Sequence, residues 1–523
     1  MPSRIGEVPV VTASRPAPAW LQSLAEPARP VRGYGLPPAM EPSRAPQPPR
    51  KRVLLIAYSF PPVGGAGVQR PAKWVKYLDQ FGWDVTVLTV ENPSVPLLDE
   101  SLLAEIPATT RIVKARTLEP GYRFKQAVSG NVGSGVGSSR GSLLKRGLRS
   151  ITSWAKKLAK LCATTLLQPD AQRLWLPAAW KVACQTLRET PHDAILVTAP
   201  PYSSFLLGQR LKARFGLPLV LDYRDEWDLS SQYLENSATA WFARHVQERM
   251  QRGVLRSADA VITTTQSSSR AIRQRLTDLA LSTRVETIYN GFDTEDFTSA
   301  TNLTTSQTTP ADKPAAGIFR LIYTGTLWNL TDITPVVKAI ETVAADAPEL
   351  AKHLEFLVVG RKTPEQRQVL DRLAALPCRV VLRDYCPHAE VLEHQSQADS
   401  LLLLLSDVPG ANRVVPAKLF EYLATRKEIL AVVPEGETAG IVREFHAESQ
   451  FTPADYTGIA CWILERLQRA TGQTNAVSSM INSAFPEQRL LDFSRKSQTA
   501  QLAGLLSEVA NAGQGIAALG GAR

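Results

Sequence analysis

The chain is short of cysteine and of long hydrophobic runs. Its five cysteines are odd in number and widely spaced over 523 residues, which fits neither a disulfide framework nor a Cys-x-x-Cys metal site. No stretch of about 18 uninterrupted apolar residues occurs, so we expect no membrane-spanning helix. The first 50 residues also lack the apolar segment of a secretory signal. These absences predict a cytoplasmic protein with reduced thiols.

Metal-ligand patterns are absent as well. The six histidines show no ligand spacing, and no cluster of Cys, His, Asp and Glu stands out. We therefore expect no metal and no resident cofactor.

Acidic residues are scarce in two segments. Met1–Arg52 has eight Lys/Arg against three Asp/Glu, a net charge of +5, and Arg111–Lys160 has twelve against one, a net charge of +11. Because the whole chain carries +10, the remainder is net −6. Two local basic segments favour surface contacts over a nucleic-acid groove, so we expect no nucleic-acid partner.

From Lys51 onward, apolar strands alternate with amphipathic helices in two series. The strands of the first series are expected at Val53–Tyr58, Asp84–Val90, Arg111–Ala115, Ala194–Thr198, Leu217–Tyr223, Ala258–Thr264 and Val285–Ile288. Those of the second are expected at Leu321–Gly325, Glu355–Gly360, Arg379–Leu382, Leu401–Leu405 and Glu428–Val433. The alternation predicts an α/β protein with two Rossmann-like, doubly wound parallel sheets that face each other across a cleft.

Composition divides the chain into five segments. We predict a disordered, proline-rich basic arm at 1–50, an N-terminal domain at 51–297, a linker at 298–316, a C-terminal domain at 317–490, and a C-terminal helix with a tail at 491–523. The arm holds twelve of the 37 prolines, and the linker is rich in Thr, Pro and Ala.

The N-terminal domain contains an insertion of unusual composition. A Gly/Ser tract at 129–142 is expected to be flexible, and residues 143–161 have helical periodicity with basic residues opposite the apolar face. Such a basic amphipathic helix is typical of an element on an anionic membrane surface. A surface helix with a solvated basic face, packed on the domain, explains the pattern equally well.

The first strand runs directly into the loop Gly64-Gly65-Ala66-Gly67, where a helix begins. Glycines let backbone amides approach a ligand closely, and a helix N-terminus attracts anions. The loop therefore predicts a site for an anionic or sugar-phosphate group at the carboxyl end of this strand.

A second loop-to-helix junction lies in the C-terminal domain. Pro416 suits the first helical position, and free amides at Ala417 and Lys418 could hold a diphosphate with help from the lysine charge. Glu421 lies one turn on and could accept hydrogen bonds from a ribose diol. The alternative is a surface helix with a Lys–Glu pair.

Charged residues cluster directly after the strand that ends at Tyr223. Asp222, Arg224, Asp225 and Glu226 would lie at the cleft, where a carboxylate could orient or deprotonate an acceptor hydroxyl. The alternative is a structural Asp–Arg pair that caps the following loop. Asp225 and Arg224 are the candidate catalytic residues.

Nine stretches, in this order along the chain, resemble the family 4 glycosyltransferases of the GT-B fold. They are RVLLIAYSFPPVGGAGVQRPAKWVKYLDQFGWDVTVLT, PDAQRLWLPAAW, VTAPPYSS, LVLDYRDEW, ADAVITTT, IYNGFDTEDF, LIYTGTL, FLVVGRK and PAKLFEYLA. The resemblance covers roughly Arg52 to Arg443, and the second to fourth stretches resemble the exopolysaccharide-type branch. The resemblance implies a GT-B-like fold, nucleotide-diphosphate-sugar donors, retention at the anomeric carbon and donor binding without a metal.

The resemblance also implies site residues. Gly64, Gly65, Ala66 and Gly67 would form an acceptor or phosphate loop. The donor would be bound by Gly325, Thr326, Arg361, Lys362, Arg413, Pro416, Ala417, Lys418 and Glu421. In this assignment Glu421 binds the ribose, and Ala417 and Lys418 bind the diphosphate. His388 resembles a residue that borders the base pocket, although a turn-and-cap role explains it equally well.

The sequence departs from the family pattern at three places. Arg413 stands where the family has the first glutamate of its Glu-x7-Glu motif, and it either binds a phosphate or carboxylated sugar or is a solvated loop charge. Thr326 and the residues after it replace an arginine and a lysine that are common in the donor loop. Arg224 and Asp225 lie where a histidine is common.

The sequence thus predicts a retaining glycosyltransferase, a family 4-like hexosyltransferase of polysaccharide or glycolipid assembly. Its acceptor would be a carbohydrate or a lipid-linked sugar, and 143–161 would bring it to the inner face of the plasma membrane. A non-catalytic or epimerase-type GT-B protein that binds a nucleotide sugar is the alternative. A nicotinamide-dependent oxidoreductase fits poorly, because GGAGVQR lacks the Gly-x-Gly-x-x-Gly pattern.

Overall fold

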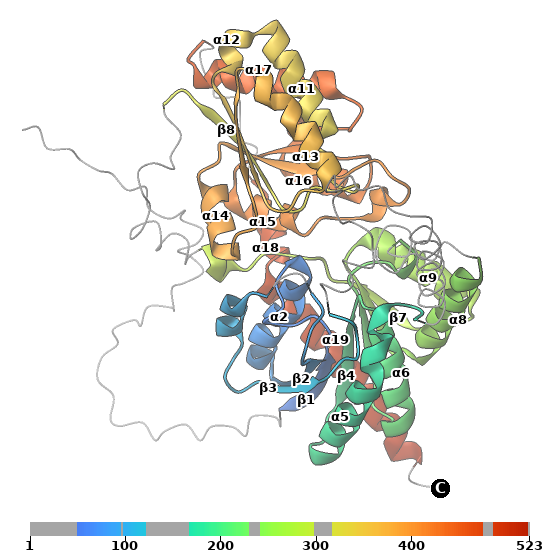
Figure 1. The fold of residues 1–523 in the computed structure, drawn as a ribbon. Coiled ribbons are helices and arrows are strands. Elements are labelled where there is room, and N and C mark those ends of the chain that lie inside the picture. The colour runs from blue at the N-terminus through green and yellow to red at the C-terminus, as the bar shows by residue number, and fades with distance from the viewer. Residues whose placement is uncertain are drawn as a thin grey trace, which may run out of the picture.

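The structure is a computed structural model that describes residues 50–95, 98–121, 167–229, 241–297, 316–473 and 485–520. It contains two α/β domains, with the N-terminal one in blue to green and the C-terminal one in yellow to orange in Figure 1. The predictions for the arm at 1–49, the Gly/Ser tract, the helix at 143–161 and the linker at 298–315 lie outside the described residues. The predicted domain bounds therefore stay a prediction.

The N-terminal sheet has seven strands in the order β3-β2-β1-β4-β5-β6-β7. All of its pairings are parallel. The strands are β1 Lys51–Ile56, β2 Trp83–Val90, β3 Arg111–Ala115, β4 Ala194–Ala199, β5 Leu219–Tyr223, β6 Ala260–Thr263 and β7 Arg284–Thr287. Each predicted strand of the first series is confirmed within a few residues. The central strands are apolar on both faces because helices cover both faces of a parallel sheet.

The helices of this domain follow the predicted alternation with one addition. They are α2 Ala66–Leu78, α5 Leu176–Glu189, α6 Ser203–Phe215, α8 Trp241–Ser257 and α9 Gln266–Asp278. A short 3-10 turn after α2 ends at Gly82, which takes the left-handed conformation that glycine favours. The sequence predicts no helix at α5. Its Pro177 is compatible with a helix because it lies in the first turn, where a proline leaves no internal hydrogen bond unmade.

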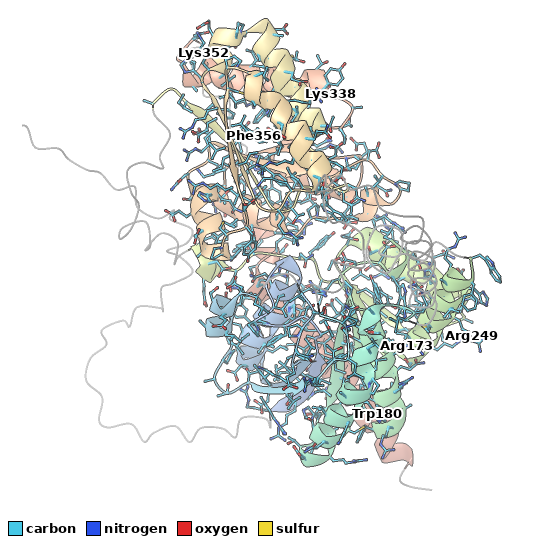
Figure 2. All side chains as sticks on the ribbon, viewed as in Figure 1. Arg173, Trp180, Arg249, Lys338, Lys352 and Phe356 are labelled. Carbon is cyan, nitrogen blue, oxygen red and sulfur yellow. The ribbon has the colours of Figure 1, made fainter. Side chains whose placement is uncertain are left out.

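The C-terminal sheet has six strands in the order β10-β9-β8-β11-β12-β13, and all pairings are parallel. Its strands are β8 Phe319–Thr324, β9 Leu354–Val359, β10 Arg379–Arg383, β11 Ser400–Leu404, β12 Glu428–Val432 and β13 Gln450–Phe451. Its helices are α11 Thr334–Asp346, α12 Pro348–Ala351, α13 Pro364–Asp371, α14 His388–Ser396, α15 Lys418–Thr425, α16 Glu437–Phe445 and α17 Tyr456–Ala470. Figure 2 shows Phe356 of β9 inside this domain, where it is fully buried.

The strand order reverses between β1 and β4 in one sheet and between β8 and β11 in the other. Open α/β sheets bind ligands at such switch points, beyond the carboxyl ends of the strands. The predicted fold class, with two doubly wound parallel sheets, is confirmed.

After the second sheet, the chain returns to the N-terminal domain. α18 Glu487–Asp492 leads into α19 Arg495–Gly520, the red helix that runs down through the lower domain in Figure 1. Leu502, Leu506 and Ala510 of α19 pack in one core cluster with Val53 of β1 and Trp83 of β2. The C-terminal helix is therefore part of the N-terminal core. None of the described helices is long and apolar enough to cross a membrane.

Candidate functional site

A cavity of about 310 Å³ lies between the two domains. From the N-terminal domain it is lined by Gly67, Arg70, Pro200, Arg224, Asp225, Glu226, Leu229, Thr264, Thr265, Ser268 and Asn290. From the C-terminal domain it is lined by Leu330, Leu405, Val408, Gly410, Ala411, Arg413, Val414, Val415, Pro416 and Ala417. Most of these residues follow the carboxyl ends of β5, β6, β7 and β11, which is where a ligand site is expected in this fold.

Six of the predicted site residues line this cavity. They are Gly67, Arg224, Asp225, Arg413, Pro416 and Ala417. The other predicted residues are outside its lining: Gly64, Gly65, Ala66, Gly325, Thr326, Arg361, Lys362, Lys418 and Glu421. Predicted residues from both domains thus meet at one cavity, while their roles in binding and catalysis stay predictions.

Arg224 holds the glycine loop against the loop after β4. Its guanidinium donates hydrogen bonds to the carbonyl oxygens of Gly67 and Pro200, and more weakly to that of Ala199 at 3.4 Å. A Cβ at Gly67 would lie 3.1 Å from Nη1 of Arg224, so only glycine fits here without displacing the arginine. Burial lowers the pKa of Arg224. The geometry gives Arg224 a positioning role.

Asp225 presents a carboxylate to the cavity. Its backbone carbonyl accepts a hydrogen bond from the Tyr202 hydroxyl at 3.0 Å, but no hydrogen bond from the described part of the chain reaches its side chain. The Asp225 side chain is exposed. Desolvation by the surrounding protein nevertheless raises the pKa of Asp225, and the positive charge of Arg224 opposes this shift. An acceptor hydroxyl could therefore reach this carboxylate directly.

The structural Asp–Arg pair that the sequence left open exists, but with a different arginine. Asp222 binds Arg70 of α2, with Nη2 and Oδ1 3.0 Å apart, and also accepts a hydrogen bond from Thr198 at 2.7 Å. Both side chains of the pair are buried, and Arg70 donates a further bond to the carbonyl of Tyr289. Sequence reasoning missed Arg70, although a charged residue between apolar helix positions is a usable signal.

Arg413 reaches across the cavity to the N-terminal domain. Its Nη1 lies 3.1 Å from Oε2 of Glu226, and Oε1 of Glu226 accepts a hydrogen bond from Ser268 at 2.7 Å. Burial raises the pKa of Glu226, while Ser268 and Arg413 oppose that shift. Arg413 is therefore not the solvated loop charge that one interpretation expects.

The start of α15 lies beside the end of β8. Lys418 donates from Nζ to the Tyr323 hydroxyl at 3.0 Å and to the Thr324 carbonyl at 2.8 Å. Gly325 has φ 128°, and a Cβ there would lie 2.4 Å from that nitrogen. Burial lowers the pKa of Lys418. α15 begins at Lys418 and not at Pro416, so the predicted helix start is early by two residues.

Glu421, the predicted ribose ligand, is paired with His388. His388 Nε2 lies 3.2 Å from Oε1 of Glu421. Burial opposes a charge on the imidazole, but Glu421 outweighs it and raises the pKa of His388 to about 9. Burial likewise opposes the charge on Glu421, yet His388 holds its pKa below the usual value. The two residues form a charged pair at neutral pH.

The remaining predicted donor residues lie near the end of β9. Lys362 donates from Nζ to the carbonyl of Gly360 at 2.6 Å and to that of Arg383, so its charge serves the loop itself. Arg361 and Thr326 are exposed. In the glycine loop, Gly65 has φ 105°, a conformation that side chains disfavour.

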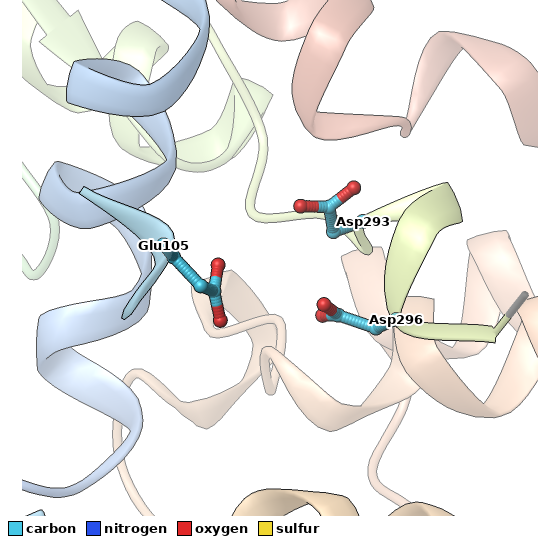
Figure 3. A group of neighbouring side chains, drawn as sticks. All are labelled: Glu105, Asp293 and Asp296. Atoms are coloured by element: carbon cyan, nitrogen blue, oxygen red, sulfur yellow. The ribbon is translucent and has the colours of Figure 1, made fainter. Parts of the chain in front are cut away.

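Among the described residues, one group of acidic side chains has the spacing of a metal site. Figure 3 shows Glu105 of one segment facing Asp293 and Asp296, which lie three residues apart on another. The ammonium group of Lys73 contacts all three, with Asp293 at 2.7 Å and Asp296 at 2.9 Å. A lysine charge therefore already occupies the centre of this group.

Comparison with known proteins identifies the domain that carries the glycine loop. Residues 64–291 match the family described as "Glycosyl transferase 4-like domain". No curated protein matches the chain. The resemblance to family 4 glycosyltransferases is thus confirmed, whereas the exopolysaccharide branch stays a prediction.

Solved structures share the fold over most of the chain. An α,α-trehalose-phosphate synthase from Burkholderia vietnamiensis is 11% identical with a TM-score of 0.57, and 88% of this chain covers 100% of it. Sucrose-phosphate synthase from Thermosynechococcus elongatus is 15% identical with a TM-score of 0.53, at 88% and 100% coverage. Anabaena HepE, solved with UDP and glucose, is 17% identical with a TM-score of 0.51, at 87% and 99% coverage. These likenesses show that the chain has a GT-B fold.

Proposed function

We propose that this protein transfers a sugar from a nucleotide-diphosphate-sugar donor to an acceptor hydroxyl, with retention at the anomeric carbon, in polysaccharide or glycolipid assembly. The observation that carries the proposal is the cavity between the two sheets. It brings the Asp225 carboxylate, which no described side chain binds, opposite the loop that leads into α15. Each domain then supplies one half of a group-transfer site.

The transfer breaks the bond between the anomeric carbon and the diphosphate oxygen and forms one to the acceptor oxygen on the same face of the sugar, as retention requires. Asp225 accepts the acceptor proton as that bond forms, and the nucleoside diphosphate leaves with the bonding electron pair. Arg224 keeps the glycine loop in place, so the acceptor hydroxyl and the donor meet in a fixed geometry. From the same position, the Asp225 carboxylate also orients the acceptor hydroxyl.

Donor binding is proposed to need no metal. The diphosphate charge would be met by the amides at the start of α15 and by Lys418. A chelator should then leave donor binding unchanged, and a loss of binding in EDTA that Mg²⁺ restores would contradict this.

A thermal-shift screen tests the donor. UDP-, GDP-, dTDP- and ADP-sugars are added to the full chain, and the correct donor should raise the melting temperature because it binds only the folded state. Glu421→Ala should remove most of that shift, since it takes away the proposed ribose ligand. If no nucleotide sugar shifts the wild-type protein, the proposed function is wrong. Release of free sugar without transfer would instead favour the epimerase-type alternative.

We further propose that the protein attaches to an anionic membrane surface that holds a lipid-linked acceptor. The predicted helix at 143–161 lies outside the described residues, but the outer face of α8 supports the proposal. Trp241 and Phe242 are 75% and 44% exposed there. Arg249, Arg252 and Arg256 are exposed on the same helix, and Figure 2 shows Arg249 at its outer side. Exposed aromatics beside basic residues are typical of a membrane-surface helix.

Sedimentation with vesicles tests this attachment. Vesicles that contain phosphatidylglycerol should bind the wild-type protein, and Arg249→Glu with Arg256→Glu should weaken binding several-fold. A second variant, in which Lys156, Lys157 and Lys160 become Glu, tests the predicted helix in the same way. Arg367→Glu on α13 of the other domain is the matched control and should bind normally. Binding that is the same for all three variants would contradict the proposal.

A further inference from the structure

Glu226 and Arg413 belong to a closed ring of polar contacts that joins the two domains. The Thr265 hydroxyl lies 2.8 Å from that of Ser268, which in turn donates to Glu226 at 2.7 Å. Glu226 pairs with Arg413 at 3.1 Å, and the Arg413 carbonyl lies 3.0 Å from the Thr265 hydroxyl. All four residues line the cavity. The ring therefore exists only when the two domains are together.

The pair keeps hydrogen-bonding capacity that faces the cavity. A guanidinium has five N–H donors, and Glu226 takes one of those of Arg413, whose side chain is still 32% exposed. The Glu226 side chain is 6% exposed, and among the described residues its carboxylate receives one contact on each oxygen, fewer than the two that each oxygen can accept. The Glu226 carboxylate therefore offers hydrogen-bond acceptors, and the neighbouring Arg413 guanidinium offers donors. That combination matches neighbouring hydroxyl groups of a sugar ring, which each donate and accept.

The charges around the pair argue against a sugar acid. Arg413 is already neutralised by Glu226, and Asp225 adds a second carboxylate to the same cavity. The other two arginines of the lining are occupied, Arg70 by Asp222 and Arg224 by backbone carbonyls. Asp228 and Arg275 also act on Glu226 from behind, with opposite signs. A carboxylate on the sugar would have to displace Glu226 from Arg413 and lie next to it.

We propose that Glu226 and Arg413 together form the subsite for the transferred sugar and that they select an uncharged hexose over a hexuronic acid. This inference rests on the proposed function and names the substrate class of the same cavity. The subsite is composite, with a carboxylate from the N-terminal domain and a guanidinium from the C-terminal domain. It reverses the sequence-based interpretation that Arg413 receives a carboxylated sugar.

The test compares pairs of donors, each a hexose donor and its uronate, whose sugars differ only at C6. Dissociation constants are measured by calorimetry for UDP, UDP-glucose, UDP-glucuronate, UDP-galactose and UDP-galacturonate. The wild-type protein should bind at least one hexose donor tenfold or more tightly than its uronate. Glu226→Gln should shrink that ratio tenfold, because it frees Arg413 and removes a negative charge, while UDP alone binds within twofold of wild type.

A second variant guards against loss of folding. Arg413→Ala should weaken the hexose donor towards the affinity of UDP alone, with no gain for the uronate. Glu248→Gln is the matched control, since this carboxylate of α8 lies outside the cavity and pairs with Arg252, and it should keep the wild-type ratio.

The outcomes separate the two claims. If the protein binds neither UDP nor any other nucleotide sugar, the proposed function fails, and this inference fails with it. If nucleotide sugars bind but the wild-type protein prefers the uronate, or if Glu226→Gln weakens UDP as much as UDP-sugar, only this inference is overturned.

Discussion

The two domains meet at two junctions that are built in different ways. At the rear junction, where the chain crosses between the domains, backbone amides donate hydrogen bonds to backbone carbonyls. Phe292 donates to the Phe493 carbonyl at 3.2 Å, and Arg495 donates to the Phe292 carbonyl at 2.8 Å. At the front junction, around the cavity, the domains meet mainly through side chains such as Glu226, Arg413 and Glu437.

Packing strengthens the contrast. A Cβ at Gly291 in the rear junction would lie 2.0 Å from the Phe493 carbonyl, so the two crossing segments approach too closely to leave room for a methyl group. In the front junction, the Glu437 carboxylate accepts hydrogen bonds from the amides of Gln266 and Ser267 at the start of α9, both at 2.7 Å. We expect a ligand in the cavity to compete with side-chain contacts of this kind more readily than with the backbone contacts at the rear. The comparison assigns stability to the rear and ligand response to the front.

The largest effect on stability is expected at the rear. Asp293 is buried and binds Lys73, Lys76 and Tyr77 at 2.6–2.8 Å. Asp293→Ala leaves two ammonium groups short of a partner, so the free energy of unfolding in urea should fall by about 3–5 kcal/mol. Glu295→Ala removes a partner of Lys76 that is 60% exposed, and this control should cost about 1 kcal/mol or less. Equal losses would remove the energetic distinction of the rear junction.

The largest effect on turnover is expected at the front. Asp225→Asn should lower kcat by about 10²–10⁴ once the donor is known, because a proton acceptor is lost. The free energy of unfolding should change by about 0.5 kcal/mol or less, since that carboxylate has no hydrogen-bonding partner among the described residues. Asp228→Asn, one turn away and paired with Arg275, should keep kcat. If Asp225→Asn unfolds the protein but leaves kcat intact, Asp225 belongs to the scaffold.

A smaller effect is expected where the front junction closes. Glu437→Gln weakens the hydrogen bonds to the α9 amides and to the Tyr289 hydroxyl, so unfolding should become easier by about 0.5–2 kcal/mol. Solution X-ray scattering should also show a larger radius of gyration without ligand. Glu435→Gln, whose partner Arg443 lies in the same domain, is the control and should scatter like wild type. An unchanged radius in Glu437→Gln would mean that the front is as fixed as the rear.

A pH dependence is expected of the His388–Glu421 pair. Because Glu421 raises the pKa of His388 from the unfolded value of about 6.5 to about 9, the pair stabilises the fold fully below pH 6.5 and loses this contribution as the pH rises through 9. Urea unfolding between pH 6 and 9.5 should show that decline in the wild type. His388→Gln should lack it, while His353→Gln, whose ring contacts the Gly317 carbonyl, should keep it. A decline that persists in His388→Gln would come from another group.

Several site residues could be predicted from the sequence. Gly67, Asp225, Pro416 and Ala417 follow apolar strands or open helices, and parallel strands bring such positions to one edge of a sheet. Thr264 and Thr265 follow β6 in the same way and carry the same signal, although the sequence analysis did not use it. Periodicity likewise predicts the strands closely, because a strand covered on both faces must be apolar throughout.

Other site residues could not be predicted from the sequence, because their role depends on a partner far along the chain. Arg413 has Glu226 as its counter-ion, and nothing in the local sequence of either residue indicates the other. Asp222 pairs with Arg70 and not with its neighbour Arg224, since α2 lies over the sheet while Arg224 turns to the glycine loop.

By itself, the sequence determined two parallel α/β sheets and the loops at their carboxyl ends, because local periodicity and turn residues decide those features. Only the tertiary structure decided which charges neutralise one another, that α19 completes the N-terminal core, and that the acidic group around Asp293 encloses Lys73. The physical reason is the separation along the chain between the residues that interact. Strand and helix formation depends on residues a few positions apart, whereas an ion pair across a cleft depends on how two separately folded surfaces meet.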